Sequence, residues 1–244
     1  MKDLFKQPLV AASLVLALSL LLSAVIASSA AYKIRTMDNV LSVTGSAKQS
    51  ITADQAKWTV NFSRPVTATT VKEGYVQLDR DLQIIKKFFV SNGFEETKLD
   101  ISTIYMDEVY ENVTPAPEFK KYTLRQTVTV ISNDVERVAA ISKNTKDIIE
   151  KGVMLAAMAP EYSYSGLATV RVKLLSDALK DARARAESIS SVSGSSVGKL
   201  KSATGGVVQV LQRGTNEVSD YGAYDTSSIE KDVMVTVRAS FAIN

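Results

Sequence analysis

The first hydrophobic pattern along the chain is a long apolar run near its start. No charged residue occurs from Pro8 to Ala31, and Leu9–Ile26 is almost wholly apolar. About 20 apolar residues can cross a bilayer as a helix, whereas the apolar part of a secretory signal is shorter, roughly 7–15 residues. Length therefore favours a transmembrane anchor within residues 1–31 over the alternative, a signal cleaved at Ser28–Ala31. The expected anchor side chains are Leu9, Val10, Leu14, Leu16, Leu18, Leu20, Leu21, Leu22, Val25 and Ile26.

The orientation of this anchor is not set by charge, because basic residues flank both ends of the apolar run. The run opens the chain in the manner of an export signal. We therefore expect a single-pass protein of the cell membrane with a cytoplasmic N-terminus and the folded part on the periplasmic or extracellular side. Residues 32–39 are expected to form a polar tether, and residues 40–244 to fold as one domain, either undivided or with two lobes.

Beyond the tether, alternation of apolar and polar residues predicts strands. Trp58, Val60 and Phe62 alternate with polar residues, which is typical of a half-buried strand. Alternate residues from Val233 to Phe241 are apolar in the same way. The other predicted strands are Val40–Ile51 with a glycine bulge at Gly45, Leu99–Tyr110, Tyr122–Ile131, Met154–Ser165 broken by Pro160, and Lys199–Gln212 with Gly205-Gly206 in its middle; the last strand spans Glu230–Ile243.

Three amphipathic helices separate these strands. The first is predicted to begin at the capping box Thr70-x-x-Glu73 and to end at Asn92-Gly93. Its apolar positions have a heptad-like spacing, so a coiled coil is one interpretation. Packing on the protein's own sheet is the favoured one, because Ile84 and Phe88 widen the apolar stripe. The spaced apolar residues are Val71, Tyr75, Leu78, Leu82, Ile85 and Phe89.

The second and third helices are predicted to follow Asn133-x-x-Glu136 and to span Leu174–Val192. The third helix carries a stripe made largely of alanine, so whatever it packs on must approach closely. Ser193-Gly194 is its expected stop. The stripe consists of Leu175, Ala178 or Leu179, Ala182, Ala186 and Ile189. The element order ββ-α-ββ-α-β-α-ββ indicates an α+β fold with mainly antiparallel sheets and about three packing helices.

The composition limits the kinds of catalysis and ligand binding that the chain can carry out. The 244 residues include no cysteine and no histidine, which removes thiolate chemistry, disulfides and the commonest metal ligand and general base. The net charge of +3 is too small to indicate nucleic-acid binding. We expect no cofactor, no metal and no enzymatic activity.

Motifs that carry chemistry are scarce. Gly194-x-Ser196-x-Gly198 matches the hydrolase nucleophile pattern, but the helix precedes it and the strand follows, which is the reverse of that motif. A helix-stop turn is the favoured interpretation, and a bulge is favoured at Gly205-Gly206. Acidic residues around the hairpin of residues 107–118 could form a loose calcium site, although a solvated hairpin is favoured. A pair of carboxylates for glycoside hydrolysis could come from anywhere in the fold.

Aromatic residues lie in or beside the two long loops, residues 111–120 and 213–228. Exposed aromatics are typical of contact surfaces, whereas ordinary loop packing is the alternative. The candidate interaction surface comprises Tyr110, Phe119, Tyr221 and Tyr224. Asn112-Val-Thr114 also matches a glycan acceptor, which matters only in a glycosylating pathway.

Three stretches together resemble one known family. They are Val43–Ala47 leading into Ala53–Ala56, the helix Asp177–Ala186 followed by Gly194 and Val197–Leu200, and the terminal strand Val233–Phe241. From Val40 to Asn244 the chain resembles the SIMPL-domain family, once called DUF541, which includes YggE-like exported proteins. That resemblance implies an exported α+β domain that assembles into ring- or channel-like homo-oligomers, without established catalysis and with an association with stress tolerance.

Two functional hypotheses follow. The first is a membrane-anchored, non-enzymatic envelope scaffold or stress-related factor, whose partners are copies of itself and membrane lipid. The second is an envelope binding module that recognises a cell-wall polymer or a partner protein through loops 111–120 and 213–228. An acid-only hydrolase is a third, less favoured interpretation.

Overall fold

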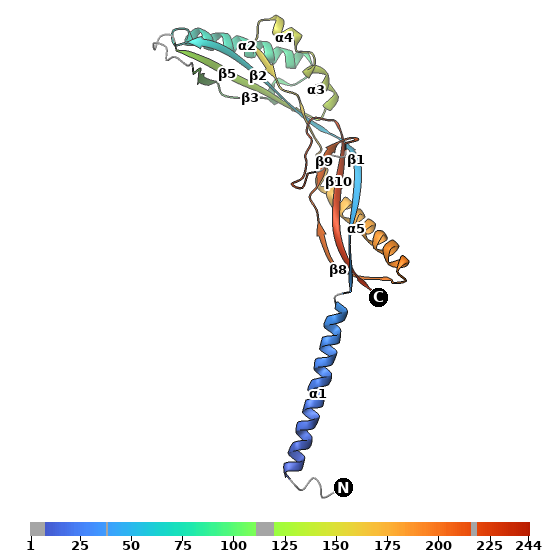
Figure 1. Cartoon of the computed structure of the whole chain (residues 1–244). Coiled ribbons are helices and arrows are strands. Elements are labelled where there is room, and N and C mark those ends of the chain that lie inside the picture. Colours follow the sequence, from blue (N-terminus) through green and yellow to red (C-terminus); the bar gives the residue numbers. More distant parts are fainter. Residues whose placement is uncertain (1–7, 38, 111–119, 216–218) are drawn as a thin grey trace. The chain divides into compact units, whose positions relative to one another are not determined.

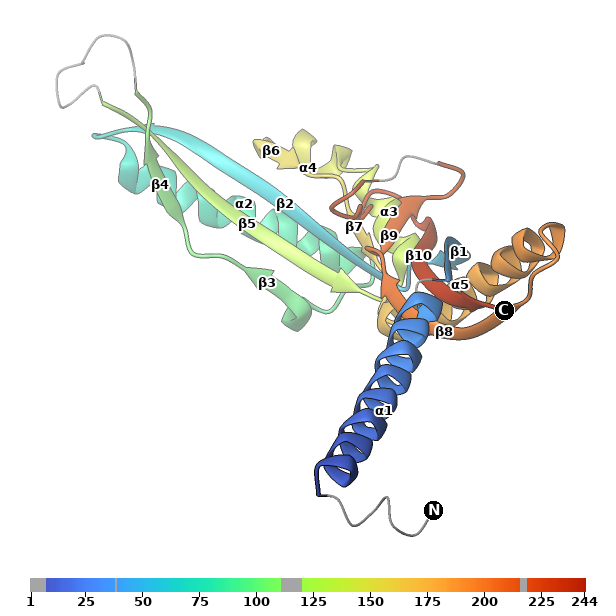
Figure 2. The same ribbon diagram turned by 60° about the horizontal axis from the view of Figure 1, so that its bottom comes forward.

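The computed structural model describes residues 8–37, 39–110, 120–215 and 219–244, with the backbone alone for 8–11 and 32–37. The predicted fold class is confirmed, since antiparallel sheets are packed by helices in an α+β arrangement (Figures 1 and 2). The chain divides into two compact units. Unit 1 comprises Met1–Ala47, Leu174–Gly206 and Val235–Asn244, and unit 2 comprises Lys48–Lys173 and Val207–Met234.

The apolar run forms helix α1 (Pro8–Met37), in which Ala12–Ala31 is long and apolar enough to cross a membrane. Residues 32–37 of the expected tether are helical, because α1 continues through Met37. Residues 32–37 include no glycine or proline, and Lys33 and Arg35 are good helix formers that also suit the negative end of the helix dipole. Only two residues therefore separate α1 from the first strand.

Unit 1 is built from one helix on one small sheet. The sheet order is β1 (Val40–Thr52), β10 (Glu230–Ile243) and β8 (Val197–Gly205), with β10 antiparallel to β8. Helix α5 (Leu167–Val192) packs on it. Strand β9 (Gln209–Gln212) pairs with Lys231–Met234 of β10, and both of these segments belong to unit 2. The buried cluster consists of Val43, Ala178, Ala182, Ala186, Val237, Ala239 and Phe241.

The alanines of the α5 stripe allow the helix to approach the sheet of unit 1 closely. A Cβ atom on Gly45 of β1 would overlap the carbonyl oxygen of Ala178 and would lie 2.8 Å from the Cα of Ala182. Gly45 lies inside an unbroken strand of 13 residues, so its role is to admit the α5 backbone rather than to form a bulge. The stripe on α5 is also shifted from the prediction, because Ile189 is exposed and Ser190 is buried in its place.

Unit 2 is a longer sheet with helices on one face. Its strand order is β3 (Leu99–Ile101), β5 (Lys121–Ser132), β2 (Gln55–Thr67) and β6 (Leu155–Ala157). Strand β4 (Tyr105–Glu108) also pairs with β5, and β7 (Glu161–Ser163) with β2. The covering helices are α2 (Val71–Ser91), α3 (Val135–Ser142) and α4 (Lys146–Glu150).

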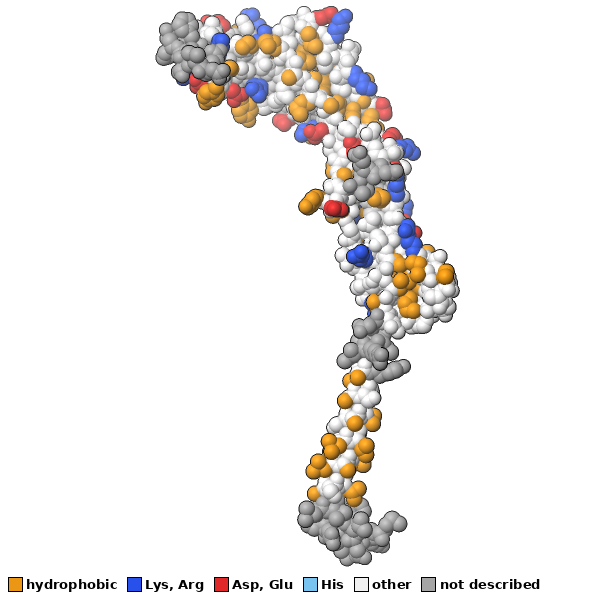
Figure 3. Space-filling model, in the orientation of Figure 1, with side chains coloured by type: hydrophobic (Ala, Val, Ile, Leu, Met, Phe, Trp, Pro, Cys, Tyr) orange, Lys and Arg blue, Asp and Glu red, His pale blue; other side chains and the backbone are white. Residues whose placement is uncertain are grey.

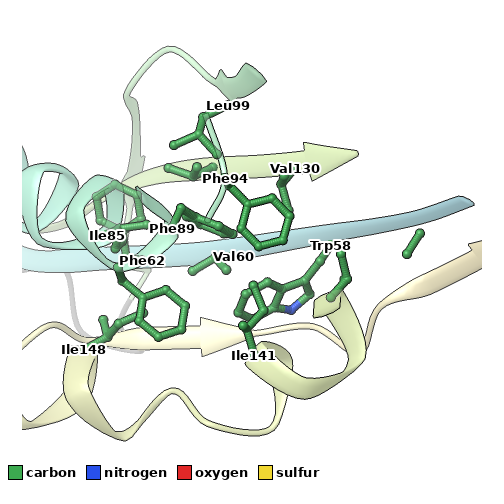
Figure 4. Packing of buried hydrophobic residues seen from close by; sticks show 14 of the residues in the cluster. Trp58, Val60, Phe62, Ile85, Phe89, Phe94, Leu99, Val130, Ile141 and Ile148 are labelled. Atoms are coloured by element: carbon green, nitrogen blue, oxygen red, sulfur yellow. The ribbon is translucent and has the colours of Figure 1, made fainter. Parts of the chain in front are cut away.

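Large side chains fill the space beneath these helices. Figure 4 shows Trp58, Val60 and Phe62 of β2 pointing toward side chains of the helices. Trp58, Phe88, Phe89 and Phe94 form a chain of edge-to-face rings with centroids 5.4–6.4 Å apart. The indole Nε1 of Trp58 donates to the carbonyl of Met158 at 2.8 Å, so the one polar atom of the tryptophan is satisfied.

A buried ion pair links α2 to β2. Arg64 donates from Nε and Nη2 to the two carboxylate oxygens of Asp81, at 2.6 and 2.7 Å, and from Nη2 to the carbonyl of Gly152. Asp81 lies on the core face of α2. The apolar positions of this helix contact its own sheet, as the favoured interpretation predicts, and Tyr75 is partly exposed. Thr70 is the N-cap residue, but its side chain makes no capping hydrogen bond to the helix; its Oγ1 accepts from the amide of Thr67 instead.

Several predicted elements are interrupted. The second predicted helix is two helices, with Asp134 rather than Asn133 as N-cap of the first, so four helices rather than about three pack on the described sheets. The strand predicted over Leu99–Tyr110 breaks between β3 and β4, and that over Lys199–Gln212 breaks after Gly205. Consecutive strands β1 and β2 do not pair, since they belong to different sheets.

Candidate functional surfaces

The candidate anchor is fully accessible along its apolar part. None of the Ala12–Ala31 segment is buried against the rest of the protein, and Figure 3 shows hydrophobic side chains along this helix. Leu9 and Val10 belong to α1, but their side chains lie outside the described residues. The other eight predicted anchor residues are exposed: Leu14, Leu16, Leu18, Leu20, Leu21, Leu22, Val25 and Ile26.

Three of the predicted interface aromatics are exposed. Tyr110 and Tyr221 are 90% and 97% exposed, and Tyr224 is about half exposed. Phe119 and the glycan acceptor motif lie outside the described residues. Exposure to this extent leaves the rings of Tyr110 and Tyr221 with little packing of their own, so they present contact area to solvent.

These tyrosines do not form one site, because unit 2 places them at opposite ends of β2. At one end Tyr162, which pairs with Ala56, donates its backbone amide to the carbonyl of Thr226 at 2.7 Å, and Thr226 belongs to the loop that carries Tyr221. At the other end Tyr122, opposite Val66, pairs with Glu108, two residues before Tyr110. Ten residues of β2 separate the two positions, about 33 Å at 3.3 Å per residue. Strands β4 and β9 accordingly lie apart in Figures 1 and 2.

The loop that carries Tyr221 is held in place by buried polar side chains. Gln209 is 5% exposed; its amide donates to the carbonyl of Ser219 and accepts from the amide of Ala223 at 2.7 Å. Lys231, 1% exposed, donates from Nζ to the carbonyl and a carboxylate oxygen of Asp225. The described residues of loop 213–228 are thus attached to unit 2 through Gln209 and Lys231, among other contacts.

Asp225 is the centre of this attachment. Burial alone would raise the pKa of its carboxyl, but hydrogen bonds from Ser227 and Ser228 and from Lys231 outweigh burial and hold the pKa well below its usual range. The charged carboxylate is therefore the form that holds the loop.

A second buried carboxylate lies on the other face of β10. Asp232 accepts from Lys48 Nζ and Ser50 Oγ, each at 2.7 Å, and from the amide of Gly214. Burial opposes ionisation here as well, yet the bonds from Lys48 and Ser50 lower the pKa of Asp232. Sequence patterns did not predict these two acids, since neither lies in a motif.

The face of the unit 2 sheet opposite the helices is polar. Short side chains of β2 and β5 lie side by side there, including a hydrogen-bonded pair, Thr59 and Thr129. A shallow hollow of about 270 Å³ opens on this face beside Asn61, Ser63 and Arg125. Arg125 is bridged to Asp107 at 3.1 Å. We call this surface the open polar face; it extends along β2 between the two tyrosine-bearing ends.

A larger groove of about 480 Å³ lies between the segment that follows α2 (residues 93–98), the end of β5 and the start of α3. Both cations that line it are already engaged. Arg137 donates to the Gly93 carbonyl, bridges Asp134 at 3.0 Å and lies over the ring of Phe94, and Lys98 is bridged to Glu95 at 2.9 Å. The groove therefore presents structural contacts rather than an available charge.

The remaining motifs have structural roles. Gly194 has the left-handed φ of +70° and ends α5, and Ser196 pairs with Asn244 through two backbone hydrogen bonds. The turn interpretation is thus confirmed. Asp107 and Glu108 of the acidic hairpin are paired with Arg125 and Lys120. Within the described ranges, no group of three metal-ligating side chains could hold an ion.

These features define a class of protein: an α+β fold of two units, preceded by one apolar helix that could be a membrane anchor or a signal sequence. The chain belongs to the SIMPL family, described as a protein of unknown function (DUF541), which matches residues 41–241. No curated protein matches the chain.

Proposed function

We propose that this protein is a membrane-anchored, non-enzymatic component of the cell envelope that assembles with copies of itself into a closed ring, acting as a scaffold or stress-related factor. Its α1 helix stays in the membrane, with the N-terminus in the cytoplasm and both units outside. A shared membrane raises the effective concentration of the folded units, so that even a weak interface favours assembly.

The observation that carries this proposal is the free edge of β8. Among the residues that the structure describes, the sheet of unit 1 ends with this strand, and every residue from Lys199 to Gly205 is exposed. An unpaired strand edge presents a row of amides and carbonyls to which another chain can add a strand. The opposite edge of the same sheet is β1. Pairing of β8 with β1 of a neighbour repeats the contact in one direction, and such contacts form a ring when the rotation closes.

The direction of each β8 amide follows from the ladder. The Gly206 amide donates to Thr236 of β10, and the register from Gly205 to Ser202 is regular. Hydrogen-bonding groups alternate in direction along an antiparallel strand, so the Ala203 amide points away from β10. Proline at position 203 therefore removes an outward donor while it leaves the ladder to β10 intact.

The experiment compares Ala203→Pro with Ala203→Ser, which keeps the amide, in full-length protein solubilised in mild detergent. Light scattering coupled to size exclusion is expected to give one closed oligomer for wild type and Ala203→Ser, and a monomer for Ala203→Pro. A monomeric wild type, or an unchanged oligomer in Ala203→Pro, contradicts assembly through this edge. A dimer in wild type indicates β8 pairing with β8 about a twofold axis, which excludes the ring.

A second candidate function is recognition of an extended cell-wall polymer, with a partner protein as the other ligand of this type. The open polar face favours the polymer, because it offers hydroxyl and amide groups over about 33 Å between the two tyrosine-bearing ends. Co-sedimentation with insoluble cell-wall material is expected to fall in the pair Asn61→Ala and Arg125→Ala and in Tyr221→Ser. Lys146→Ala on α4, an exposed position on the helical side, serves as control. Unchanged sedimentation of all variants removes this candidate.

A further inference from the structure

The exposed apolar residues of unit 1 are gathered at one end. Beyond α1, four large apolar side chains are exposed among the described residues of this unit: Val40, Ile189, Val192 and Leu200. Val192 is 90% exposed on the last residue of α5. Figure 3 shows hydrophobic side chains grouped over this end of α5.

Backbone contacts place these residues together. The amide of Ile243 donates to the carbonyl of Asn39, just before Val40, and Ile243 lies opposite Val197 in the sheet. Only the turn of residues 193–196 separates the end of α5 from Val197. The start of β1, the end of β10, the start of β8 and the end of α5 therefore form one end of unit 1, which we call the basal end.

Chain length places the basal end beside the membrane. Three residues from Met37 to Val40 span at most about 11 Å. The six helical residues beyond the apolar span add about 9 Å. Headgroup layers occupy roughly 5–8 Å on each side of the hydrocarbon core. A folded end tethered this closely to a membrane-spanning helix cannot move far from the lipid surface.

Charge at the basal end also suits lipid. Lys199 and Lys201 flank Leu200 on β8 and are exposed. The acids on the nearby turns of α5 are neutralised, since Asp181 is bridged to Arg185 and Glu187 to Arg183. Exposed apolar side chains with adjacent lysines are the combination that binds at the interface of anionic membranes.

We propose that the basal end of unit 1 docks on the headgroup layer of the same bilayer that α1 spans, with Ile189 and Val192 inserted at the interface and Lys199 and Lys201 on anionic headgroups. This inference rests on the proposed anchor. It adds a second membrane contact that fixes the folded part against the surface.

The test uses the absence of cysteine in the chain, which makes each introduced thiol unique. Full-length protein with Val192→Cys is labelled with a polarity-sensitive fluorophore and reconstituted in nanodiscs that contain anionic lipid with or without spin-labelled lipid. Val172→Cys, 69% exposed on α5 within unit 2, is the matched control. Leu20→Cys, at the middle of the apolar span, reports on the anchor itself.

Docking predicts blue-shifted emission and quenching by headgroup-level spin labels at position 192, water-like emission at 172, and quenching by deep spin labels at 20. Quenching at 20 with water-like emission at 192 overturns docking and leaves the anchor intact. A blue shift at 192 without lipid quenching indicates burial on a protein surface and also overturns docking. Absence of quenching at 20 overturns the anchor and docking together.

A separate experiment tests the proposed contacts between the two lysines and anionic headgroups. Replacing Lys199 and Lys201 with glutamine is expected to weaken docking about fivefold per lysine in anionic nanodiscs, as the fraction of quenched label at 192 measures. The same replacement has no effect in zwitterionic nanodiscs. An equal loss in both lipids contradicts the proposed lysine contacts.

Discussion

The two units pack helices against a sheet in opposite ways. Unit 2 fills the space between helices and sheet with large rings, whereas unit 1 removes that space by bringing α5 against β1 through alanine and glycine. Trp58 and Phe89 are wholly buried in the first core; Ala178 and Ala182 are wholly buried in the second. A core of large side chains is sensitive to lost volume, and a core of small ones to added volume.

The largest effect is expected from added volume in unit 1. Gly45→Val would drive side-chain atoms into the α5 backbone at Ala178 and Ala182, which cannot move independently of the helix. We expect destabilisation of more than about 4 kcal/mol, measured by denaturant unfolding. Gly205→Ala is the matched control, because its new Cβ meets only the flexible side chain of Leu175 at 3.3 Å. Equal, small effects of both changes would show that α5 does not depend on close approach.

The second-largest destabilisation is expected from the loss of side-chain volume in the core of unit 2. Trp58→Ala removes a wholly buried indole and leaves the Met158 carbonyl without its donor. The expected loss is about 3–5 kcal/mol in the free energy of unfolding. Trp58→Phe keeps most of the volume and should lose less. Were the alanine variant as stable as the phenylalanine variant, the ring cluster would not be the source of stability in unit 2.

A smaller, pH-dependent effect is expected at the attachment of loop 213–228. The folded pKa of Asp225 lies below its unfolded value, which is about 3.9. Its carboxylate therefore stabilises the fold above that unfolded value, and this contribution is lost as the pH falls through the folded pKa. Hydrogen exchange of the Ala223 amide should stay slow at pH 5–8 relative to its intrinsic rate and lose protection in acid. In Asp225→Asn, protection should be low at neutral pH and change less with acid.

The smallest effect is expected on the outer face of α5. Arg183 and Glu187 form an exposed pair at 2.9 Å, one helical turn apart. Such pairs contribute about 0.3–0.5 kcal/mol and are screened by salt. A double-mutant cycle with alanine at both positions should give a coupling in this range that declines in 1 M salt. A coupling above about 1 kcal/mol would mean that this face is partly shielded from water.

Local patterns predicted most of the elements, because in these elements the period of the apolar residues matches the period of the buried positions. The alternation in β2 and β10 and the spacing in α2 place most of the buried apolar residues correctly, with Tyr75 as an exception. Predictions failed where a long-range contact determines the outcome. The close approach of α5 to Gly45 involves residues more than 130 positions apart, and no local pattern distinguishes such a glycine from a bulge.

The candidate surfaces were only partly predictable for the same reason. Tyr110 and Tyr221 could be named from loop composition, but their separation along β2 depends on strand pairing. The buried attachment of loop 213–228 was also missed, because Gln209 and Lys231 lie in strands where a polar residue normally faces water. A lysine or glutamine at a buried strand position is recognisable only once the register is known.

The most direct test of the account is native mass spectrometry of the full-length protein in mild detergent, together with identification of its N-terminal residue. An anchored, self-assembling protein predicts one large multiple of the 26.4 kDa chain, with Met1 or Lys2 retained. A monomer that begins near Ala31 or Tyr32 would contradict the account, because both the anchor and the assembly would then be absent.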